Sequence, residues 1–511
     1  MDSTKLFNKI INRKNLELAF DLAIKDKINT SHFYDPIEIA LSDRQEIKDK
    51  IIIELLEKLK NPRYFKPKPC FAFFPNKTIL CHRRMIDIPL RDLVLRYAFV
   101  LILAEKLETS FINNCFANRR EIEDKKELRL LQNFAETSWP NFCDWQIDMS
   151  KNYSILLKTD ISSFYDSISH DYLIDIIATE LGIKSNSKVL KLLHKLLRLK
   201  IYYYDPDNKL ISQTMKHGLA TNNSSEGFFA NLYLNHIDKK IESENISYAR
   251  YVDDIRIWGN DEKLILNTLY NLQKLLLAKG LNLNANKTRI AKKPKLIKEL
   301  LSKKSDTNYI IFENEDVEVN PIALDGELDN HLDDFNLNFD MNKTIRNSND
   351  AKLFCKKLNF NINRAYFIPL EQRTIVFIRK LSSIIKNFPN VGKFAAWILV
   401  HSSYEVNIPI EVKVFAKKEI IKLLSNSNIN SYPKYRLLHH ITRYSRLNMI
   451  NFNQGEISEM IDIAKIFIKE CEYELKIVSL FFLLIMKPDN FDLKEFFKTD
   501  EILKLKSYSL K

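Results

Sequence analysis

Residues 246–259, ISYARYVDDIRIWG, place two adjacent acids between two short stretches of aromatic and β-branched residues. Such stretches favour β-strands, so the segment predicts a hairpin with Asp253 and Asp254 at its turn. An Asp–Asp turn is also common for purely structural reasons, because aspartate side chains hydrogen-bond nearby backbone groups. Here Tyr251 and Val252 directly precede the pair. The hairpin therefore predicts a sheet that presents two carboxylates at one end.

A third acid, Asp160, ends another predicted strand. Ile155 to Leu157 form a short apolar run that is typical of a buried strand. A carboxylate at the mouth of such a strand is costly unless a cation or hydrogen bonds compensate it. Taken alone, Asp160 is more typical of a turn or a cap.

Carboxylates that are brought together repel one another unless a divalent metal lies among them, and Mg²⁺ prefers carboxylate and water oxygens. Two such ions, about 3.5–4 Å apart, can activate an attacking hydroxyl and stabilise a leaving pyrophosphate. Phosphoryl transfer needs little else from a protein beyond positioning and charge.

The two acidic segments resemble those of the reverse-transcriptase palm. Tyr-Val-Asp-Asp is similar to the family's signature, and Asp-Ile-Ser-Ser-Phe-Tyr-Asp-Ser-Ile, which begins at Asp160, resembles its first acidic motif. The two occur in the family's order. The resemblance implies that Asp160, Asp253 and Asp254 are catalytic. It also implies two Mg²⁺ ions per active site, or Mn²⁺ in their place, bound by Asp160, Ile161, Asp253 and Asp254.

Tyr165 occupies a position where the family has an aromatic residue that presses on the sugar and excludes a 2′-hydroxyl. A bulky ring that rejects an extra oxygen would select deoxynucleotides. Without the resemblance, a core tyrosine is an equally good interpretation. We interpret the neighbouring Asp166 as structural.

Residues 217–238, HGLATNNSSEGFFANLYLNHID, resemble the family's nucleotide-binding helix in their second half. Apolar residues at helical spacing there are expected to pack on the sheet; they are Phe229, Leu232, Tyr233 and Ile237. The first half departs from the family, which usually has Pro-Gln-Gly, or a Pro and a Gly two apart, after Gly218-Leu219. Those positions hold Ala220, Thr221 and Asn222, and Glu226 replaces the usual Ser. In the family this loop steadies the incoming base against a template, so the change argues against ordinary templated copying.

Further candidates for nucleotide binding flank this region. Residues 83–92, RRMIDIPLRD, are similar to the family's fingers segment, and Arg84 fits the arginine that clamps the triphosphate, since a guanidinium suits phosphate. Residues 280–290, GLNLNANKTRI, resemble the motif whose lysine lies near the leaving pyrophosphate; as an isolated residue, that lysine would be surface filler. The full set of nucleotide-binding candidates is Arg84, Arg83, Lys77, Tyr165, Asn222 and Lys287.

A stripe of cations occurs in the segment KSNSKVLKLLHKLLRLK. The charges recur at steps of four and three, which places them on one helix face with leucines opposite. A solvated face is the default interpretation, and a stripe that tracks phosphates is the sharper one. Its members are Lys184, Lys188, Lys191, Lys195 and Arg198.

The bulk composition is globular, with 45% hydrophobic residues, and the net charge of +13 favours a polyanionic partner such as nucleic acid or acidic lipid. A basic, solvated surface is the alternative. The six cysteines form no CxxC pair, which indicates neither a zinc cluster nor a disulfide framework. The N-terminus lacks a signal-peptide core, and the most apolar run, Ile477 to Met486, is too short to span a bilayer. We therefore expect a cytoplasmic protein without a membrane partner.

The chain divides into four predicted parts within an α+β fold class. Residues 1–65 read as helical, and 66–300 resemble the fingers and palm of a reverse transcriptase. Residues 301–350 form an acidic connector, because 313–340 contain no Lys or Arg. Residues 351–511 read as an all-α domain of successive amphipathic helices, either a helical repeat or a bundle. Examples are Thr374–Phe388, Ile410–Leu424 and Ile457–Met486.

This architecture resembles the abortive-infection reverse transcriptases of bacterial phage defence, of the Abi-P2 and AbiK-like kind. The resemblance implies untemplated synthesis of single-stranded DNA from deoxynucleoside triphosphates, primed by a protein hydroxyl, so that the product is attached to the protein. It also implies assembly into a homo-oligomer and HEAT-like helical repeats over residues 351–511. Tyr34, in the polar segment SHFYDP, is the first candidate for the priming residue. Two alternatives stay open: a template-directed enzyme of retron-like or group-II-like type, and a non-catalytic nucleic-acid-binding scaffold.

Overall fold

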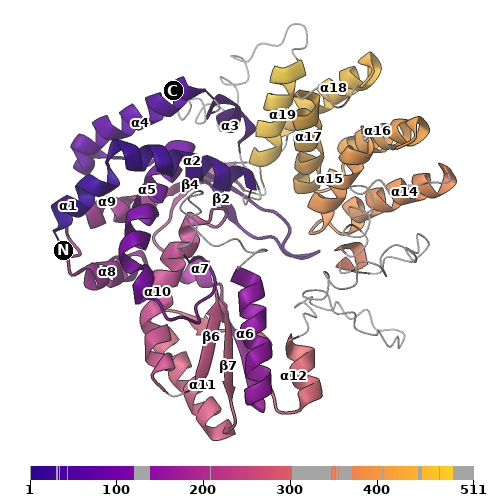
Figure 1. The fold of residues 1–511 in the computed structure, drawn as a ribbon. Coiled ribbons are helices and arrows are strands. Elements are labelled where there is room, and N and C mark those ends of the chain that lie inside the picture. The colour runs from indigo at the N-terminus through magenta and orange to yellow at the C-terminus, as the bar shows by residue number, and fades with distance from the viewer. Residues whose placement is uncertain are drawn as a thin grey trace.

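The computed structural model describes most of the chain, and its elements are drawn in Figure 1. The described residues are 2–29, 33, 35–42, 44–119, 138–205, 207, 209–244, 246–301, 347–348, 350–352, 355, 371–404, 408–446, 450, 452–470 and 472–486. Tyr34, the acidic segment 313–340 and Cys471 lie outside them. No helix in the described part is long and apolar enough to cross a membrane.

The N-terminal segment is helical, as expected, and its helices share one hydrophobic core with the fingers and palm. Helix α2 packs along α5 (Leu90–Leu107), which is buried over nearly its whole length. In α4 the residues at helical spacing, Ile52, Leu55 and Leu59, form the buried face. The helices are α1 (Ser3–Ile10), α2 (Arg13–Asn29), α3 (Pro36–Ser42) and α4 (Gln45–Lys60).

A four-stranded sheet lies beside these helices, in the order β2-β1-β4-β5. Strands β1 and β4 pair in parallel and the other pairs are antiparallel. The connection between β1 and β2 carries Lys77, Arg83 and Arg84. The strands are β1 (Cys70–Phe73), β2 (Met85–Asp87), β4 (Lys200–Tyr204) and β5 (Leu210–Thr214).

A second sheet has the order β6-β7-β3-β8, with β9 also pairing β3. Its β3 side chains alternate between two covered faces. Leu156 lies in a cluster with Trp258 and Ile297, on the side of α6 and α12. Leu157 joins the main core, on the side of α10 and α11. The strands are β3 (Ile155–Ser162), β6 (Ser247–Tyr251), β7 (Asp254–Gly259), β8 (Asn282–Leu283) and β9 (Arg289–Ala291). The helices of this part of the chain are α6 (Trp139–Asn152), α7 (Phe164–Ser167), α8 (His170–Leu181), α9 (Lys188–Leu197), α10 (Ser225–Glu242), α11 (Glu262–Leu277) and α12 (Pro294–Leu301). Of these, α6, α10, α11 and α12 contact strands of the sheet.

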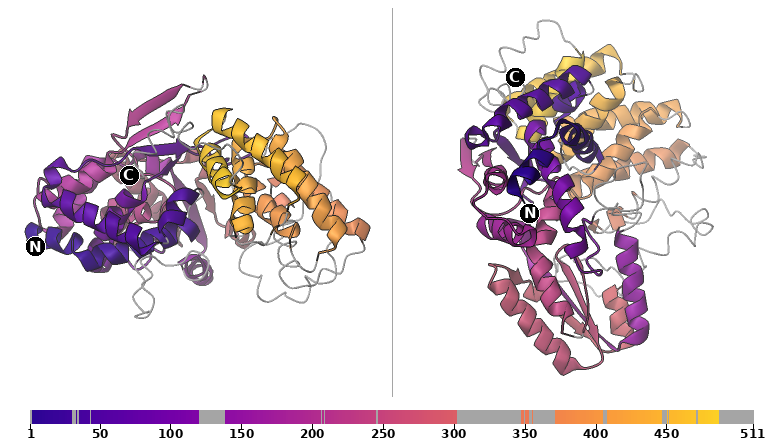
Figure 2. Two further views of the ribbon diagram at one scale, coloured as in Figure 1. Left: turned by 90° about the horizontal axis from the view of Figure 1, so that it is seen from above. Right: turned by 60° about the vertical axis from the view of Figure 1, so that its left-hand side comes forward.

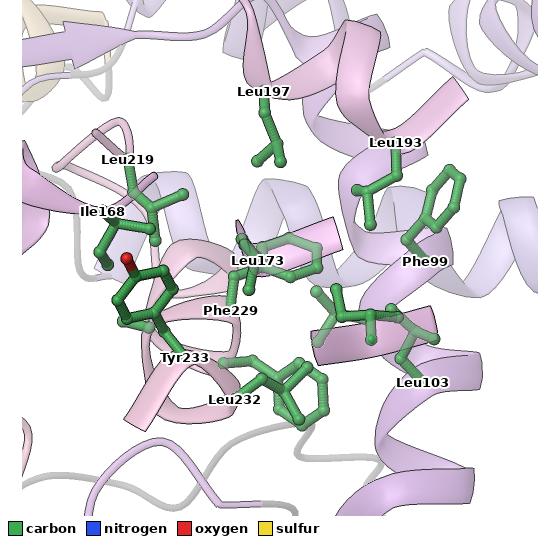
Figure 3. Close-up of a cluster of buried hydrophobic side chains, with 14 of the residues drawn as sticks. Phe99, Leu103, Ile168, Leu173, Leu193, Leu197, Leu219, Phe229, Leu232 and Tyr233 are labelled. Atoms are coloured by element: carbon green, nitrogen blue, oxygen red, sulfur yellow. The ribbon is translucent and has the colours of Figure 1, made fainter. Parts of the chain in front are cut away.

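The expected packing of α10 on the sheet is only partly right. The helix contacts β6, but its apolar face lies mainly against α5 and α8, in a cluster that also holds leucines of α9 (Figure 3). Phe229, Leu232 and Tyr233 are all nearly inaccessible to solvent there. The face is thus a helix–helix contact, which a helical periodicity alone does not distinguish from a helix–sheet contact.

The C-terminal part is all-α over its described residues, and its hydrophobic core also includes Phe33, Phe71, Phe73 and Met85 of the N-terminal segment and the four-stranded sheet. The helix expected over 457–486 is instead two, because α18 ends at Glu470 and α19 begins at Tyr473. The two pack on each other, and α19 is buried along most of its length. A HEAT-like repeat stays a prediction. The helices are α14 (Glu371–Asn387), α15 (Gly392–Ser402), α16 (Ile410–Ser425), α17 (Ser431–Arg446), α18 (Gln454–Glu470) and α19 (Tyr473–Met486).

Helix α19 joins these helices to the four-stranded sheet, beside which they lie in Figure 2. The Tyr473 ring stacks on Phe71 of β1 with centroids 4.6 Å apart, and its hydroxyl donates to Asp87 of β2 at 2.8 Å. The ammonium of Lys27 in α2 contacts the same carboxylate at 3.0 Å and Glu38 at 2.8 Å. Both Lys27 and Asp87 are nearly inaccessible to solvent. The network joins three segments that are far apart in the sequence.

Candidate active site

The three predicted acids meet at one end of the β3–β7 pair. Asp160 of β3 lies opposite Asp254 of β7 in the antiparallel register. Tyr251 pairs with Asp254, so β6 and β7 are joined by Val252 and Asp253 alone, as a tight hairpin. The backbone N–H of Ile161 donates to the Asp253 carbonyl at 3.2 Å. The predicted hairpin and strand are thus both present, and they lie side by side.

The hairpin turn is strained and is held from the inside of the protein. Val252 has a φ of +55°, which is an outlier for a β-branched residue. Its carbonyl accepts from Arg250 Nη1 at 2.8 Å. Strain of this kind persists only where the surroundings enforce it, and it clusters at functional sites.

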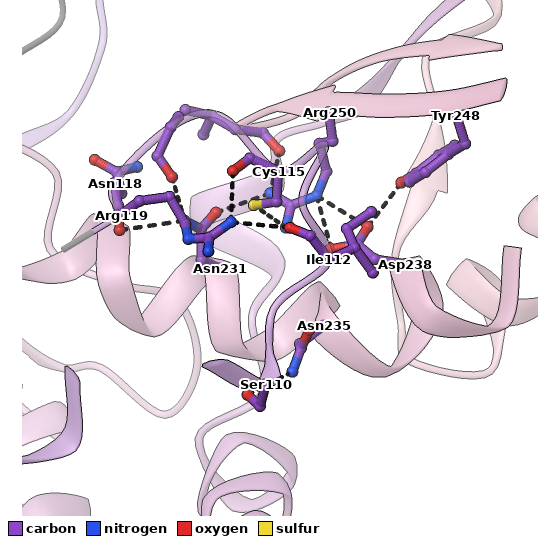
Figure 4. Close-up of polar contacts among 12 residues, drawn as sticks. Ser110, Ile112, Cys115, Asn118, Arg119, Asn231, Asn235, Asp238, Tyr248 and Arg250 are labelled. Atoms are coloured by element: carbon purple, nitrogen blue, oxygen red, sulfur yellow. Dashed lines mark hydrogen bonds and ion pairs between the residues drawn. The ribbon is translucent and has the colours of Figure 1, made fainter. Parts of the chain in front are cut away.

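Arg250 is itself fixed by residues of the 217–238 motif, as Figure 4 shows. It is fully buried, and its guanidinium donates to Asp238 of α10 at 2.6 Å and to Asn231 of α10 at 2.8 Å. The hydroxyl of Tyr248 also donates to Asp238, at 2.7 Å. Sequence reasoning missed this network. An arginine inside an otherwise apolar strand was the available signal, because a buried guanidinium requires a partner.

The pKa values of Asp253 and Asp160 are both raised. Burial, and then the negative charges of Asp160 and Asp254, raise the pKa of Asp253 to about 6. Burial is also the main cause that raises the pKa of Asp160, and the Lys287 ammonium opposes it. Asp254 lies 3.5 Å from Arg256 Nη1. The end of the sheet therefore carries unfavourable negative charge that a cation would relieve.

The residues present fit a divalent cation in the chemistry of their donors. Asp160, Asp253 and Asp254 offer only oxygen, and Ile161 can offer only its backbone carbonyl. In the present side-chain positions, the described residues form no group of three or more His, Cys, Asp or Glu that could hold an ion. The fit therefore rests on oxygen donors that share one sheet end and on their mutual repulsion.

Lys287 and Asn284 both contact Asp160. Lys287 Nζ lies 3.5 Å from Oδ1, and Asn284 Nδ2 donates to Oδ2 at 3.3 Å. The Asn284 backbone N–H donates to the Asp160 carbonyl at 2.7 Å. The structure thus brings the predicted lysine to the acids. Asn284 was missed, since a lone asparagine in a polar segment carries no sequence signal.

Tyr165 lies at the junction of the first acidic motif and the 217–238 motif. Its carbonyl accepts from the Leu219 N–H at 2.8 Å. Burial, and next the charge of Asp253, raise the pKa of its hydroxyl. Gly218 has a φ of +85°, and a Cβ there would lie 3.0 Å from the Asp166 carbonyl oxygen. Only glycine therefore lets the two motifs approach so closely.

Side chains of the altered loop after Leu219 are bonded to other parts of the protein. Asn222 Nδ2 donates to the Phe33 carbonyl at 2.9 Å and its Oδ1 accepts from the Phe33 N–H at 3.4 Å. Ser224 donates to Asp26 through its backbone N–H at 2.9 Å and through its hydroxyl at 2.5 Å. Glu226 is fully buried and forms an ion pair with Arg96. The side chain of Asn222, predicted to bind nucleotide, thus binds the N-terminal segment.

Of the basic residues in the β1–β2 connection, one is paired with an acid and two are exposed. Arg84 pairs with Asp166 at 2.8 Å, and its carbonyl accepts from Thr221 Oγ1 at 2.9 Å. This places Arg84 next to the first acidic motif. Lys77 and Arg83 are exposed.

Two residues of the cationic stripe contact the N-terminal segment. The Lys188 ammonium lies 4.4 Å from the centroid of the Phe7 ring, and Lys195 donates to the carbonyls of Pro62 and Arg63. These two residues thus pack the N-terminal segment onto α9. The other three, Lys184, Lys191 and Arg198, are exposed.

Residues 110–312 match the family model described as reverse transcriptase (RNA-dependent DNA polymerase). The matched stretch includes the three acids, Tyr165 and Lys287, whereas Arg84 precedes it. No curated protein sequence matches the chain.

Two solved structures are distantly similar. One is apo telomerase from Candida tropicalis, truncated from its C-terminal domain, with 12% identity and a TM-score of 0.33 over 46% of this chain and 51% of that one. The chain thus spans about half the length of that structure. The other is telomerase from Candida albicans in complex with the TWJ fragment of telomeric RNA, with 13% identity and a TM-score of 0.35 over 88% and 72%. Both similarities are too distant to assign a function.

Proposed function

Since the chain carries a reverse-transcriptase domain, a nucleotidyltransferase by class, we propose that it joins deoxynucleotides at Asp160, Asp253 and Asp254. The observation that supports this most is the register that sets Asp160 opposite Asp254, with Asp253 at the adjoining turn. Two Mg²⁺ ions bound there, or Mn²⁺, would supply activation of the attacking hydroxyl and neutralisation of the leaving pyrophosphate.

The surrounding side chains have distinct proposed roles. Lys287, 3.5 Å from Asp160, supplies a positive charge or a proton near the leaving group. Arg84 binds the triphosphate through its guanidinium fork. Tyr165 rejects a 2′-hydroxyl by contact.

Synthesis proceeds without a template in this proposal. The loop that holds a base against a template in related enzymes is here bonded to the protein, through Asn222 to Phe33 and through Ser224 to Asp26. A template-directed RNA-dependent DNA polymerase is the second candidate, favoured by the description of the matching family. Supplying defined RNA templates and sequencing the DNA separates the two, because only the second candidate yields complementary products.

The product is further proposed to be single-stranded DNA attached to a protein hydroxyl, in a cytoplasmic, homo-oligomeric bacterial enzyme of abortive phage infection. Tyr34 is the first candidate for the primer. Nuclease treatment of the purified protein tests attachment: a fall in mass after DNase supports it, and an unchanged mass opposes it. Loss of phage protection in the Asp253→Ala/Asp254→Ala variant tests the defence role, and light scattering gives the number of subunits.

A non-catalytic scaffold that binds nucleic acid is a third candidate, and the net charge of +13 favours it. It predicts salt-sensitive binding without metal-dependent incorporation of nucleotides.

A further inference from the structure

Helices α15 and α17 carry a group of basic residues that is not part of the site described above. Arg436, His440 and Arg443 follow one another at steps of four and three on α17, and so share one face. Lys393 is in the first turn of α15. The preceding Gly392 abuts α17, because a Cβ on it would lie 3.2 Å from Pro433 Cγ. We name Lys393, Arg436, His440 and Arg443 the α17 basic cluster.

The cluster has no acidic partner among the described residues. The ion pairs between described residues of the C-terminal helices join Lys422 to Glu419 on α16 and Lys465 to Asp462 on α18. Lys393 and Arg436 are half-buried, so their charges are only partly hydrated. Burial, and then the neighbouring charge of Arg436, lower the pKa of Lys393 to about 8. A bound anion would relieve this repulsion between cations.

Two buried donors in the cluster also lack an acceptor. Arg436 Nη2 lies 3.4 Å from His440 Nε2. A guanidinium can only donate, so Nε2 accepts and the proton of the neutral ring resides on Nδ1. His440 is only 5% exposed, and its Nδ1 has no hydrogen-bond partner in the described part of the chain. The Nε of Arg436 is buried and equally unpartnered. Buried donors without an acceptor are rare in proteins, and an anionic ligand would satisfy them.

We propose that the α17 basic cluster binds the phosphate backbone of a single nucleic-acid strand, as a site separate from the catalytic acids. The helix rises about 10 Å from Arg436 to Arg443, which is longer than one phosphate group and suits successive phosphates. Guanidinium groups bind phosphate through paired hydrogen bonds. Arg443 is exposed and gives the strand access from solvent, Arg436 is half-buried, and His440 is buried.

Strand binding is measured on full-length protein that carries Asp253→Asn and Asp254→Asn, so that it does not depend on catalysis. The probe is a fluorescent 20-nucleotide oligo-dT, followed by anisotropy at several salt concentrations. Arg436→Gln/Arg443→Gln should raise Kd about tenfold and make its salt dependence shallower. The matched control is Lys386→Gln/Lys418→Gln, which removes the same charge from exposed lysines of α14 and α16 and should change Kd less than about twofold.

Three further results decide the proposal. Arg436→Lys/Arg443→Lys should restore part of the affinity, since it restores the charge but not the fork. Equal weakening by the glutamine pair and by its control would overturn the proposal, and so would no weakening by either. Displacement of the oligonucleotide by inorganic phosphate at an equal concentration of phosphate groups would overturn the assignment to a strand. Should the double variant fail to fold, the exposed single variant Arg443→Glu is compared with Lys418→Glu by the same criteria.

Discussion

Asp160 on β3 faces Asp254 on β7 across an antiparallel pair, although ninety-three residues lie between them in the sequence. The same pairing continues in unbroken register from Ile155 opposite Gly259. Because side chains alternate along a strand, a shift of one residue would turn Asp160 to the other face of the sheet. The apolar residues that fill both faces of β3 therefore also determine where its acid lies.

Asp253 should destabilise the metal-free protein at neutral pH. Its pKa is raised from 3.8 to about 6, so its contribution to stability is fully present below pH 3.8 and is lost as the pH rises through 6. Asp253→Asn should therefore raise the free energy of unfolding at pH 7.5 in EDTA by about 1–3 kcal/mol. Urea denaturation with and without Mg²⁺ measures this. Mg²⁺ should stabilise the wild type more than the variant, and a variant less stable than wild type in EDTA contradicts the account.

Arg250 should hold the hairpin turn in its strained form. Arg250→Met removes the partner of the buried Asp238 and should cost about 3–5 kcal/mol of unfolding free energy. Arg250→Lys keeps the charge but cannot reach Asp238, Asn231 and the Val252 carbonyl together, so it should fold and lose at least about tenfold in nucleotide incorporation. Denaturation and incorporation assays check the two effects, with the exposed Arg289→Lys as the control. Wild-type activity in Arg250→Lys would show that nucleotide incorporation does not depend on how Arg250 holds the turn.

The hydrophobic patterns predicted β3, the β6–β7 hairpin and the helical ends of the chain, because each depends on local periodicity. Arg250 and Asp238 could not be paired from sequence, since their contact depends on how α10 packs beside the hairpin. The hydrogen bond between Asn222 and Phe33 joins residues 189 apart in the sequence. Where a loop differs from the loops of its family, its sequence does not indicate which residues it contacts instead. The division of 457–486 into α18 and α19 was likewise hidden, because no Gly or Pro marks the break between the two helices.

His170 should make the palm sensitive to acid. It is buried, with Nε2 2.6 Å from the Gly218 carbonyl, and burial lowers its pKa to about 4. The stability that its neutral form contributes is fully present above pH 6.5 and is lost as the pH falls through 4. His170→Gln should flatten the fall in unfolding free energy between pH 6.5 and 4 by about 1–3 kcal/mol. Denaturation at a series of pH values tests this, and identical slopes in both proteins would contradict it.

Tyr473 should fasten the C-terminal helices to the four-stranded sheet. Tyr473→Phe removes its hydrogen bond to the Asp87 carboxylate, which is also paired with Lys27, and should cost about 1–3 kcal/mol. We expect earlier cleavage between the two parts in limited proteolysis and a lower denaturation midpoint. Tyr270→Phe, which changes a ring that is 61% exposed, is the matched control. Equal behaviour of the two variants would show that the apolar contacts of α19 suffice.

The central claim is that Asp160, Asp253 and Asp254 form one catalytic site. Nucleotide incorporation by Asp160→Asn tests it most directly, because only the pairing of β3 with β7 places Asp160 beside the hairpin acids. The assay follows labelled deoxynucleotides with Mg²⁺ and with Mn²⁺, beside Asp144→Asn, which makes the same change at an exposed position of α6. The account predicts a loss of at least about a hundredfold in Asp160→Asn, an unchanged rate in Asp144→Asn, and cooperative unfolding in both. Incorporation by Asp160→Asn at the wild-type rate would contradict it.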